Sequence, residues 1–309
     1  MSLKNFIPEL WADSILVALQ KQLVFGALFN ADYEGTIKNM GDTVKINSVG
    51  DITIYNYVKD TDINPPQSLT DAQQMLTISQ AKYFNFEIDD VDMAQSYPKV
   101  MGEATQRAGY QMAETMDEYY AGFYTDAVSA NLIGNSGSFV TPVVPINTNI
   151  GGGQTVYDYL VQLNQLLTQN YVQKAGRWCV VPPWITTLLI QDLRFTSFNT
   201  PDARMTLMTN KLDASGGQVG FDAYLGKVAG MDVYESNNSP HLGGTVGAAG
   251  SQDVVIAGHS MALTKAEGMN KVEAYRPPYR FADAVKGIAL YGAKTVRPYA
   301  LAAAYLQHP

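Results

Sequence analysis

The chain has 309 residues, of which 46% are hydrophobic and 16% are charged, and its net charge is −8. This length supports one large domain or two closely joined domains with a sizeable buried core. So few charges suit a surface partly covered by neighbours, and they suit an ordinary monomer with a tyrosine-rich surface equally well. The acidic balance argues against a dedicated nucleic-acid-binding protein, but it is compatible with a container that encloses DNA without gripping it.

Residues 1–40 begin with apolar side chains that share a helical spacing and then drift into glycine and polar residues. The apolar set consists of Leu10, Trp11, Ile15, Leu19 and Leu23. Such an arm has little core of its own. We expect it to pack back on its own domain or to lie across a partner.

The periodicity changes to two from Asp42 to Ile88, which predicts strands. Val44 and Ile46 alternate with polar residues, and Ile52 and Ile54 do so again after a turn at residues 50–51. The second arm carries a set of one parity: Leu76, Ile78, Phe84, Phe86 and Ile88. A polar tip at 60–71, with a proline pair, separates the two arms. A two-stranded excursion of this kind is marginal alone, so we expect it to rest on something else.

A long helix is predicted after this excursion. The acidic cluster Asp89, Asp90 and Asp92 is typical of a helix start, and Pro98 fits the first turn. Apolar residues then follow every three or four positions from Met101 to Ala127. This pattern predicts about thirty residues of helix, roughly 45 Å at 1.5 Å per residue.

The rest of the chain reads as a compact α/β segment with an extended C-terminal return. A connection rich in glycine, asparagine and proline spans 134–153. It is followed by a helix at 155–170, a strand at 177–181 that ends at a proline pair, and a helix near Trp184. Short strands are expected near 226–234 and 253–257, on either side of the glycine-rich loop 239–251.

One motif imitates a catalytic site. Residues 258–262, Gly-His-Ser-Met-Ala, resemble the nucleophile elbow of α/β hydrolases, and Asp283 and His308 follow Ser260 in the order of a hydrolase triad. However, only about fifty residues remain after the elbow, where that fold still needs several βα units. A hydrolase using Ser260 is therefore the weaker alternative.

No metal, cofactor or membrane-spanning site is predicted. The three histidines lie far apart in the sequence, and the single Cys179 excludes a disulfide framework. No stretch approaches eighteen consecutive apolar residues, and the N-terminus lacks the pattern of a signal peptide. Among the cations, Arg276 and Arg280 favour ion pairs at strand edges over a nucleic-acid groove, and Lys59 favours an ordinary role over a covalent cross-link to a neighbour.

Four segments resemble the major capsid proteins of tailed bacteriophages, particularly coat proteins of short-tailed phages. Residues 86–96 resemble the family's passage into its spine helix, and 107–117 resemble the spine helix itself. Residues 256–263 resemble the return into the peripheral domain, and 281–298 resemble the strand that follows. The order of parts, from arm through excursion and long helix to compact segment and extended return, covers nearly the whole chain.

The resemblance implies an α+β tailed-phage capsid fold. It divides the chain into an N-terminal arm at 1–40, an E-loop at 41–88, a P-domain (spine helix and long strands) at 89–150 and 260–298, and an A-domain at 151–259 and 299–309. Contacts between subunits are expected at Trp11, Lys59, Asp60, Asp62, Pro65, Pro66, Arg276 and Arg280.

The implied function is structural and not enzymatic. Copies of the chain would form the pentamers and hexamers of an icosahedral phage head that encloses double-stranded DNA. Its expected partners are itself, scaffolding and portal proteins, and DNA held by enclosure alone. Its expected location is the virion, after assembly in the host cytoplasm. A non-viral shell of the same fold that encloses cargo enzymes is a further alternative.

Overall fold

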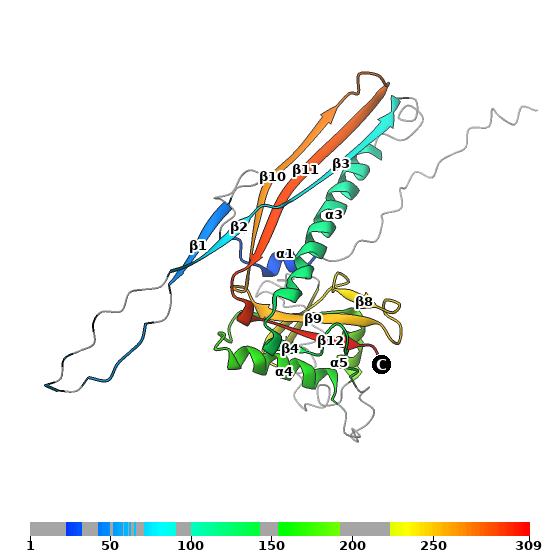
Figure 1. Ribbon diagram of the computed structural model, residues 1–309. Coiled ribbons are helices and arrows are strands. Elements are labelled where there is room, and N and C mark those ends of the chain that lie inside the picture. Colours follow the sequence, from blue (N-terminus) through cyan, green and yellow to red (C-terminus); the bar gives the residue numbers. More distant parts are fainter. Residues whose placement is uncertain are drawn as a thin grey trace, which may run out of the picture.

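The computed structural model describes residues 23–32, 43–49, 52–57, 59–60, 62, 65, 71–90, 100–142, 154–191 and 223–309. Figure 1 shows an elongated α+β molecule. Long strands and one long helix form one end, a compact part with shorter strands and helices forms the other, and a thin ribbon projects sideways. The mixed fold class expected from the sequence is confirmed.

The compact part is built on a seven-stranded sheet. Its strands follow the order β4, β12, β9, β5, β7, β6, with β8 beside β9. Their bounds are β4 Leu132–Ile133, β5 Arg177–Val181, β6 Tyr224–Val228, β7 Met231–Glu235, β8 His241–Gly243, β9 Gln252–His259 and β12 Leu301–Gln307. Strand β12 pairs in parallel with β4, and the paired residues lie 171 positions apart, as in Ala303 and Leu132.

Both faces of this sheet are buried, which explains why β5 is apolar after its first residue, Arg177. Cys179 and Val181 face a core shared with α4 (Val156–Gln169) and α5 (Pro183–Gln191). Trp178 and Val180 face the opposite core, which includes the short helix α1 (Phe25–Leu28). Burial also raises the pKa of the Cys179 thiol, so this cysteine is an inert core residue.

Helix α4 starts and ends at well-defined caps. Thr155 and Asp158 form a capping box at its start, and Asn170 ends it. The fully buried Arg177 closes the other end by donating to the carbonyl oxygens of Gln173 and Asn164 at 2.9 and 3.1 Å, and to Thr168 Oγ1 at 2.8 Å. A cation at the C-terminal end of a helix complements the helix dipole. The sequence prediction of α4, β5 and α5 is confirmed.

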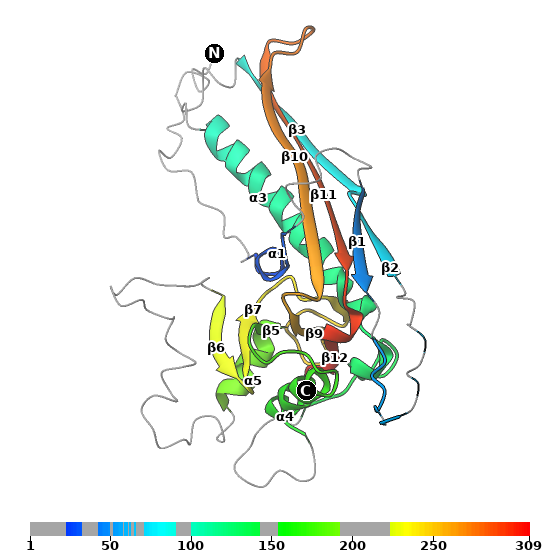
Figure 2. The same cartoon turned by 90° about the vertical axis from the view of Figure 1, so that its left-hand side faces the viewer.

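The elongated part combines a three-stranded antiparallel sheet with the long helix. The strand order is β10 (Leu263–Tyr275), β11 (Ala282–Thr295), β3 (Gln80–Asp89). Helix α3 (Val100–Ala121) runs along one face of this sheet (Figures 1 and 2). Tyr291 of β11 packs edge-on against Tyr119 and Tyr120 of α3, which fixes the helix on the sheet.

Helix α3 is shorter than the sequence pattern predicted. It has 22 residues, about 33 Å at 1.5 Å per residue, and the apolar spacing continues beyond it in a 3-10 segment, Gly122–Asp126. A second 3-10 turn, Ser129–Asn131, leads into β4, and a third, Pro298–Ala300, leads into β12. In the first segment Tyr124 turns toward Tyr305 of β12. The apolar period of a 3-10 turn resembles that of a helix, so the pattern alone could not mark the change.

A buried carboxylate joins three distant segments. Asp117 of α3 is only 3% exposed, and it accepts hydrogen bonds from the backbone N–H groups of Val24 and Gly26 and from Asn238 Nδ2. The last bond measures 3.0 Å and comes from the loop after β7. Burial raises the pKa of Asp117, and its hydrogen bonds oppose that shift. Asp117 is thus the junction between the elongated part, the compact part and α1.

The projecting ribbon consists of β1 (Thr43–Val49) and β2 (Asp71–Thr77), which pair antiparallel. Its base is anchored because Ile46, Leu76 and Ile78 are buried against Ala266 and Leu290 of the long strands. The rest of the predicted second arm behaves differently. Residues 80–89 pair with β11 as a sheet strand, and Phe84 and Phe86 are half-buried there.

Candidate assembly surfaces

The distal part of the excursion presents unpaired apolar side chains. Ile54 is 93% exposed, and Ile52, Tyr55 and Tyr57 are exposed as well. The alternation of Ile52 and Ile54 predicted a strand, but residues 52–57 adopt no regular structure and take part in no sheet of the described chain. That expectation was wrong for residues 52–57, which have no partner strand in the part of the chain that the structure describes.

The predicted contact residues of the excursion tip are described only in part. Lys59, Asp60, Asp62 and Pro65 are exposed, and Asp60 has a left-handed backbone with φ of 65°, as in a tight turn. Trp11 and Pro66 lie outside the described residues, as do most of the predicted N-terminal arm and Asp92. The described residues of the tip are therefore exposed and carry both signs of charge.

Among the described residues, the ribbon base covers part of the outer face of the three-stranded sheet. Leu290, next to the helix-facing Tyr291, lies under the ribbon base, so the two neighbours point to opposite faces. Further along the same face, Ile288 pairs with Tyr83 of β3 and with Lys271 of β10. Tyr83 is among the most exposed aromatic residues in the described chain.

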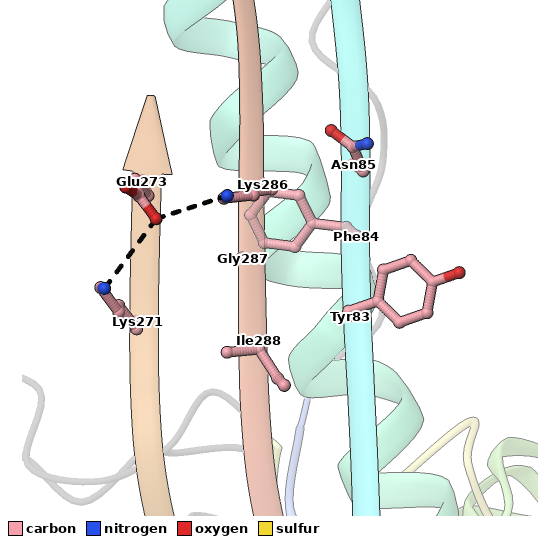
Figure 3. Close-up of a pocket in the computed structure, with 8 residues that line it drawn as sticks. All are labelled: Tyr83, Phe84, Asn85, Lys271, Glu273, Lys286, Gly287 and Ile288. Carbon is pink, nitrogen blue, oxygen red and sulfur yellow. Dashed lines mark ion pairs between the residues drawn. The ribbon is translucent and has the colours of Figure 1, made fainter. Parts of the chain in front are cut away.

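This uncovered stretch of the outer face forms an open groove of about 380 Å³. Figure 3 shows Tyr83, Ile288 and the charged residues along it, with α3 behind the strands. Glu273 lies between two lysines, 3.5 Å from Lys286 Nζ and 3.9 Å from Lys271 Nζ. Since one carboxylate serves two ammonium groups, the groove has a net charge of about +1 beside an apolar floor.

The hairpin between β10 and β11 presents a second apolar tip. Tyr279 is 97% exposed, and Phe281 is also exposed. Arg276 forms an ion pair with Asp90, and Arg280 forms one with Glu87. The strand-edge ion pairs favoured by the sequence are therefore present. They neutralise the tip and leave its two aromatic rings as the main feature available to a partner.

The hydrolase alternative has no geometric support. Ser260 lies near the end of β10 where Leu263 pairs with Thr295, whereas Asp283 lies at the other end, beside the Tyr275–Ala284 pair. The eleven residue steps from 284 to 295 span about 36 Å at about 3.3 Å per residue. His308 follows β12 at the end of β9 remote from Ser260.

His259, beside Ser260, also has a structural role. It accepts a hydrogen bond from the Met261 N–H at Nδ1 and donates from Nε2 to the Ala175 carbonyl oxygen, 2.8 Å away. Within the described ranges, no group of three or more histidine, cysteine, aspartate or glutamate side chains is placed to hold a metal ion. None of the described helices is both long and apolar enough to cross a membrane.

Comparison with solved structures shows the class to which this fold belongs. The chain is similar to a protein of Mycobacterium phage Che8, with 25% identity over 98% of each chain and a TM-score of 0.72. It is similar in fold to the capsid of cyanophage P-SCSP1u, with 17% identity over 100% of this chain and 95% of that one and a TM-score of 0.68. The capsid of Ralstonia phage GP4 matches with 12% identity over 100% and 99% and a TM-score of 0.69.

The fold is thus that of phage capsid proteins. A family model described as phage capsid protein matches residues 73–304, so the chain belongs to the phage capsid protein family. It is a structural major capsid protein and not an enzyme, as the sequence resemblance implied. No curated protein sequence matches the chain.

Proposed function

We propose that copies of this chain form the pentamers and hexamers of an icosahedral phage head that encloses double-stranded DNA. Membership of the capsid family carries this proposal, because a capsid protein is part of a virion shell built from many copies. The net charge of −8 per subunit fits retention of DNA by enclosure, since an acidic wall does not adhere to phosphates. Assembly in the host cytoplasm, with scaffolding and portal proteins as partners, is part of the same proposal.

The domain division predicted from the sequence completes this proposal. The compact part, 151–259 and 299–309, is the A-domain that surrounds the capsomer centre. The α3 helix and the long strands, within 89–150 and 260–298, are the P-domain. The ribbon and its distal segment form the E-loop, and the pairing of β3 with β11 supports moving residues 80–88 from the E-loop to the P-domain.

The E-loop of one copy would lie across a neighbouring copy and cover its own exposed apolar residues. Ile52, Ile54 and Tyr57 are exposed in the single chain, and exposed apolar clusters of this kind mark interaction sites. The groove on the outer sheet face is a suitable receiving surface. It continues the face on which the chain's own ribbon base already packs, and its lysines complement Asp60 and Asp62 of the tip.

Negative-stain electron microscopy of the purified chain tests the proposed shell. We expect closed particles or capsomers, in the presence of the phage's scaffolding protein if the chain alone does not close. If the folded chain remains a monomer under both conditions, the assembly proposal is wrong. The comparisons above are all to phage proteins, which favours a virion over a cargo-enclosing shell, and terminase and portal genes beside its gene would identify a phage head.

Two sets of variants test the E-loop contact. Ile54→Asp should leave the unfolding free energy of the subunit within about 0.5 kcal/mol, because the side chain is solvated, but it should abolish assembly. Ile54→Val is the matched control and should assemble normally. Charge reversal of Lys271 and Lys286 to Glu should impair assembly, and reversal of Asp60 and Asp62 to Lys should restore it. Normal assembly of the groove variant would exclude this groove as the receiving surface while leaving the shell itself in place.

A further inference from the structure

A buried carboxylate in the compact part is surrounded by three side-chain donors. Asp253 at the start of β9 accepts a hydrogen bond from Trp184 Nε1 of α5 at 2.7 Å and another from Ser251 Oγ at 2.7 Å. His241 Nδ1 of β8 lies 2.9 Å from the other carboxylate oxygen. The three donors hold the carboxylate of Asp253 in place, and among them His241 is the one whose number of N–H groups changes with its protonation.

The ring of His241 has an acceptor on each side. Nδ1 faces the carboxylate of Asp253, and Nε2 faces the carbonyl oxygen of Gly244 at 3.2 Å. A neutral imidazole has only one N–H group, so it satisfies one of these acceptors and turns a lone pair toward the other. Only the imidazolium donates to both. The hydrogen bond to Asp253 is accordingly the main cause that raises the pKa of His241 above its ordinary value of 6.5.

The Gly244 carbonyl belongs to a loop that has few other attachments. Gly244, Gly247 and Gly250 in this loop have positive φ angles, which reflects its tight, irregular course. Apart from its own turns, the loop is held at its start by the pairing of Gly243 with Gln252 of β9, and at its end by two bonds with the C-terminal residues, from Gly250 N–H to the His308 carbonyl at 2.9 Å and from His308 N–H to the Ser251 carbonyl at 2.8 Å. Between these two ends, the His241–Gly244 bond is the side-chain contact that ties the loop to the core.

We propose that His241 is a proton-dependent clamp on the loop 243–250. As an imidazolium it ties Gly244 to the buried Asp253, and on losing its Nε2 proton it releases Gly244 and loosens the loop together with its attachment to the C-terminal residues. The loop exposes Val246, and Leu242 is exposed beside it. The clamp thus controls the order of an apolar surface of the compact part.

Among the described residues, Asp253 is the one ionic partner of His241. From β9 the ring meets Asp253, and from the loop it meets the uncharged Ser251 hydroxyl at 3.5 Å. A second histidine lies close to the same cluster, because the ring of His308 contacts Trp184, with centroids 4.8 Å apart, and Trp184 also donates to Asp253. His308 is the competing titratable group, so the test must separate these two histidines.

Hydrogen–deuterium exchange of the full chain, kept unassembled, tests the clamp. After correction for the chemical exchange rate, peptides covering 243–251 should lose about tenfold in protection between pH 6 and pH 8.5, a factor at the lower end for one hydrogen bond to a charged group. His241→Gln should show the low protection at both pH values. His308→Gln, which keeps both backbone bonds, should retain the pH dependence of the wild type.

Three results would overturn the proposal: equal corrected protection at the two pH values, a pH dependence that survives in His241→Gln, or its loss in His308→Gln. A titration of the His241 ring by NMR gives an independent reading on the wild type, and a midpoint at or below the ordinary 6.5 would also contradict the clamp. Because these measurements use the unassembled chain, they do not depend on the proposed shell. A pH dependence of assembly would be a consequence that rests on both proposals.

Discussion

The buried junction at Asp117 gives the sharpest test of how the parts of this subunit are held together. In Asp117→Ala the N–H groups of Val24 and Gly26 and the amide of Asn238 lose their acceptor inside the core. Each unsatisfied buried donor costs about 1 to 3 kcal/mol. The bond to Val24 is long, at 3.4 Å, and relief from burying a charge offsets part of the loss. We expect a net loss of about 2 to 4 kcal/mol in the free energy of unfolding.

Asp117→Asn should be milder, because the structure contains a spare acceptor. Asn238 Oδ1 is buried and has no hydrogen-bond partner. If the Asn238 amide rotates, its oxygen can accept from the side-chain nitrogen introduced at position 117, while the side-chain oxygen that remains there still accepts from Gly26. The long bond to Val24 is lost, and the rotated Asn238 Nδ2 turns to the site that its oxygen has left, so we expect a cost of about 1 to 2 kcal/mol, below that of Asp117→Ala.

The raised pKa of Asp117 adds a dependence on pH with a defined sign. Because the folded-state pKa lies above the ordinary 3.8, the folded chain binds more protons than the unfolded chain between these two values. Stability from this group is therefore complete below pH 3.8 and is lost as the pH rises through the folded-state pKa. Asp117→Asn removes this titration, so its stability should lack that part of the wild-type decline.

Urea unfolding followed by circular dichroism on unassembled subunits measures all three effects. Glu118→Gln, at an exposed position of the same helix, is the control and should change stability by less than about 0.5 kcal/mol. If Asp117→Asn proved as damaging as Asp117→Ala, the junction would require the negative charge itself. If Asp117→Ala matched the Glu118→Gln control, the junction would contribute nothing to stability.

Three further predictions concern packing and reactivity. Gly292→Ala should lower the free energy of unfolding by about 1 to 3 kcal/mol, because the new Cβ would lie 2.4 Å from the Thr77 carbonyl oxygen. Gly109→Ala in α3 is the matched control: its Cβ meets no atom within 4 Å, so it should raise the free energy of unfolding by about 0.5 to 1 kcal/mol, and equal melting temperatures of the two variants would contradict this reasoning. Arg177→Met should lower the free energy of unfolding by about 3 kcal/mol, and Arg177→Lys should lower it less, since lysine keeps a charge and some hydrogen-bond donors. An unchanged melting temperature in Arg177→Met would show that α4 does not need this cap. Cys179 should react with a thiol reagent only after denaturation, and rapid labelling of the native chain would show that its strand opens.

The sequence predicted best where the signals for an element are local. The capping box at Thr155 and Asp158 and the leucine spacing that follows it determine α4 within its own residues. The apolar run before residues 182–183 likewise determines β5 and the start of α5. The residue pattern of each element specifies which of its side chains are buried, so these elements can be predicted without knowing which distant segments they pack against.

Long-range pairing and buried polar contacts were not predictable in this way. The parity of Phe84 and Phe86 indicates a strand but not its partner, which lies about 200 residues further on in β11. Asp117 reads as one more acidic residue on a helix, and only the fold brings Asn238 to it. For Arg177 a signal did exist, since an arginine that opens an otherwise apolar strand must be hydrogen-bonded if it is buried.

The ribbon shows how one subunit can be stable alone and still be incomplete. Ile46, Leu76 and Ile78 bury the base of the ribbon inside the subunit, so its direction is set before any neighbour arrives. Beyond that base, Ile52 and Ile54 keep a strand-like alternation without a partner strand among the described residues. Because these isoleucines are exposed to solvent, they contribute no burial free energy to the folding of the single subunit. Burying each of them on a neighbouring subunit would contribute about 1.5 to 3 kcal/mol to assembly. Docking must also order the irregular backbone of residues 52–57, so only the part of this gain that exceeds the lost conformational entropy drives assembly, and the ordered base limits the loss to the distal segment.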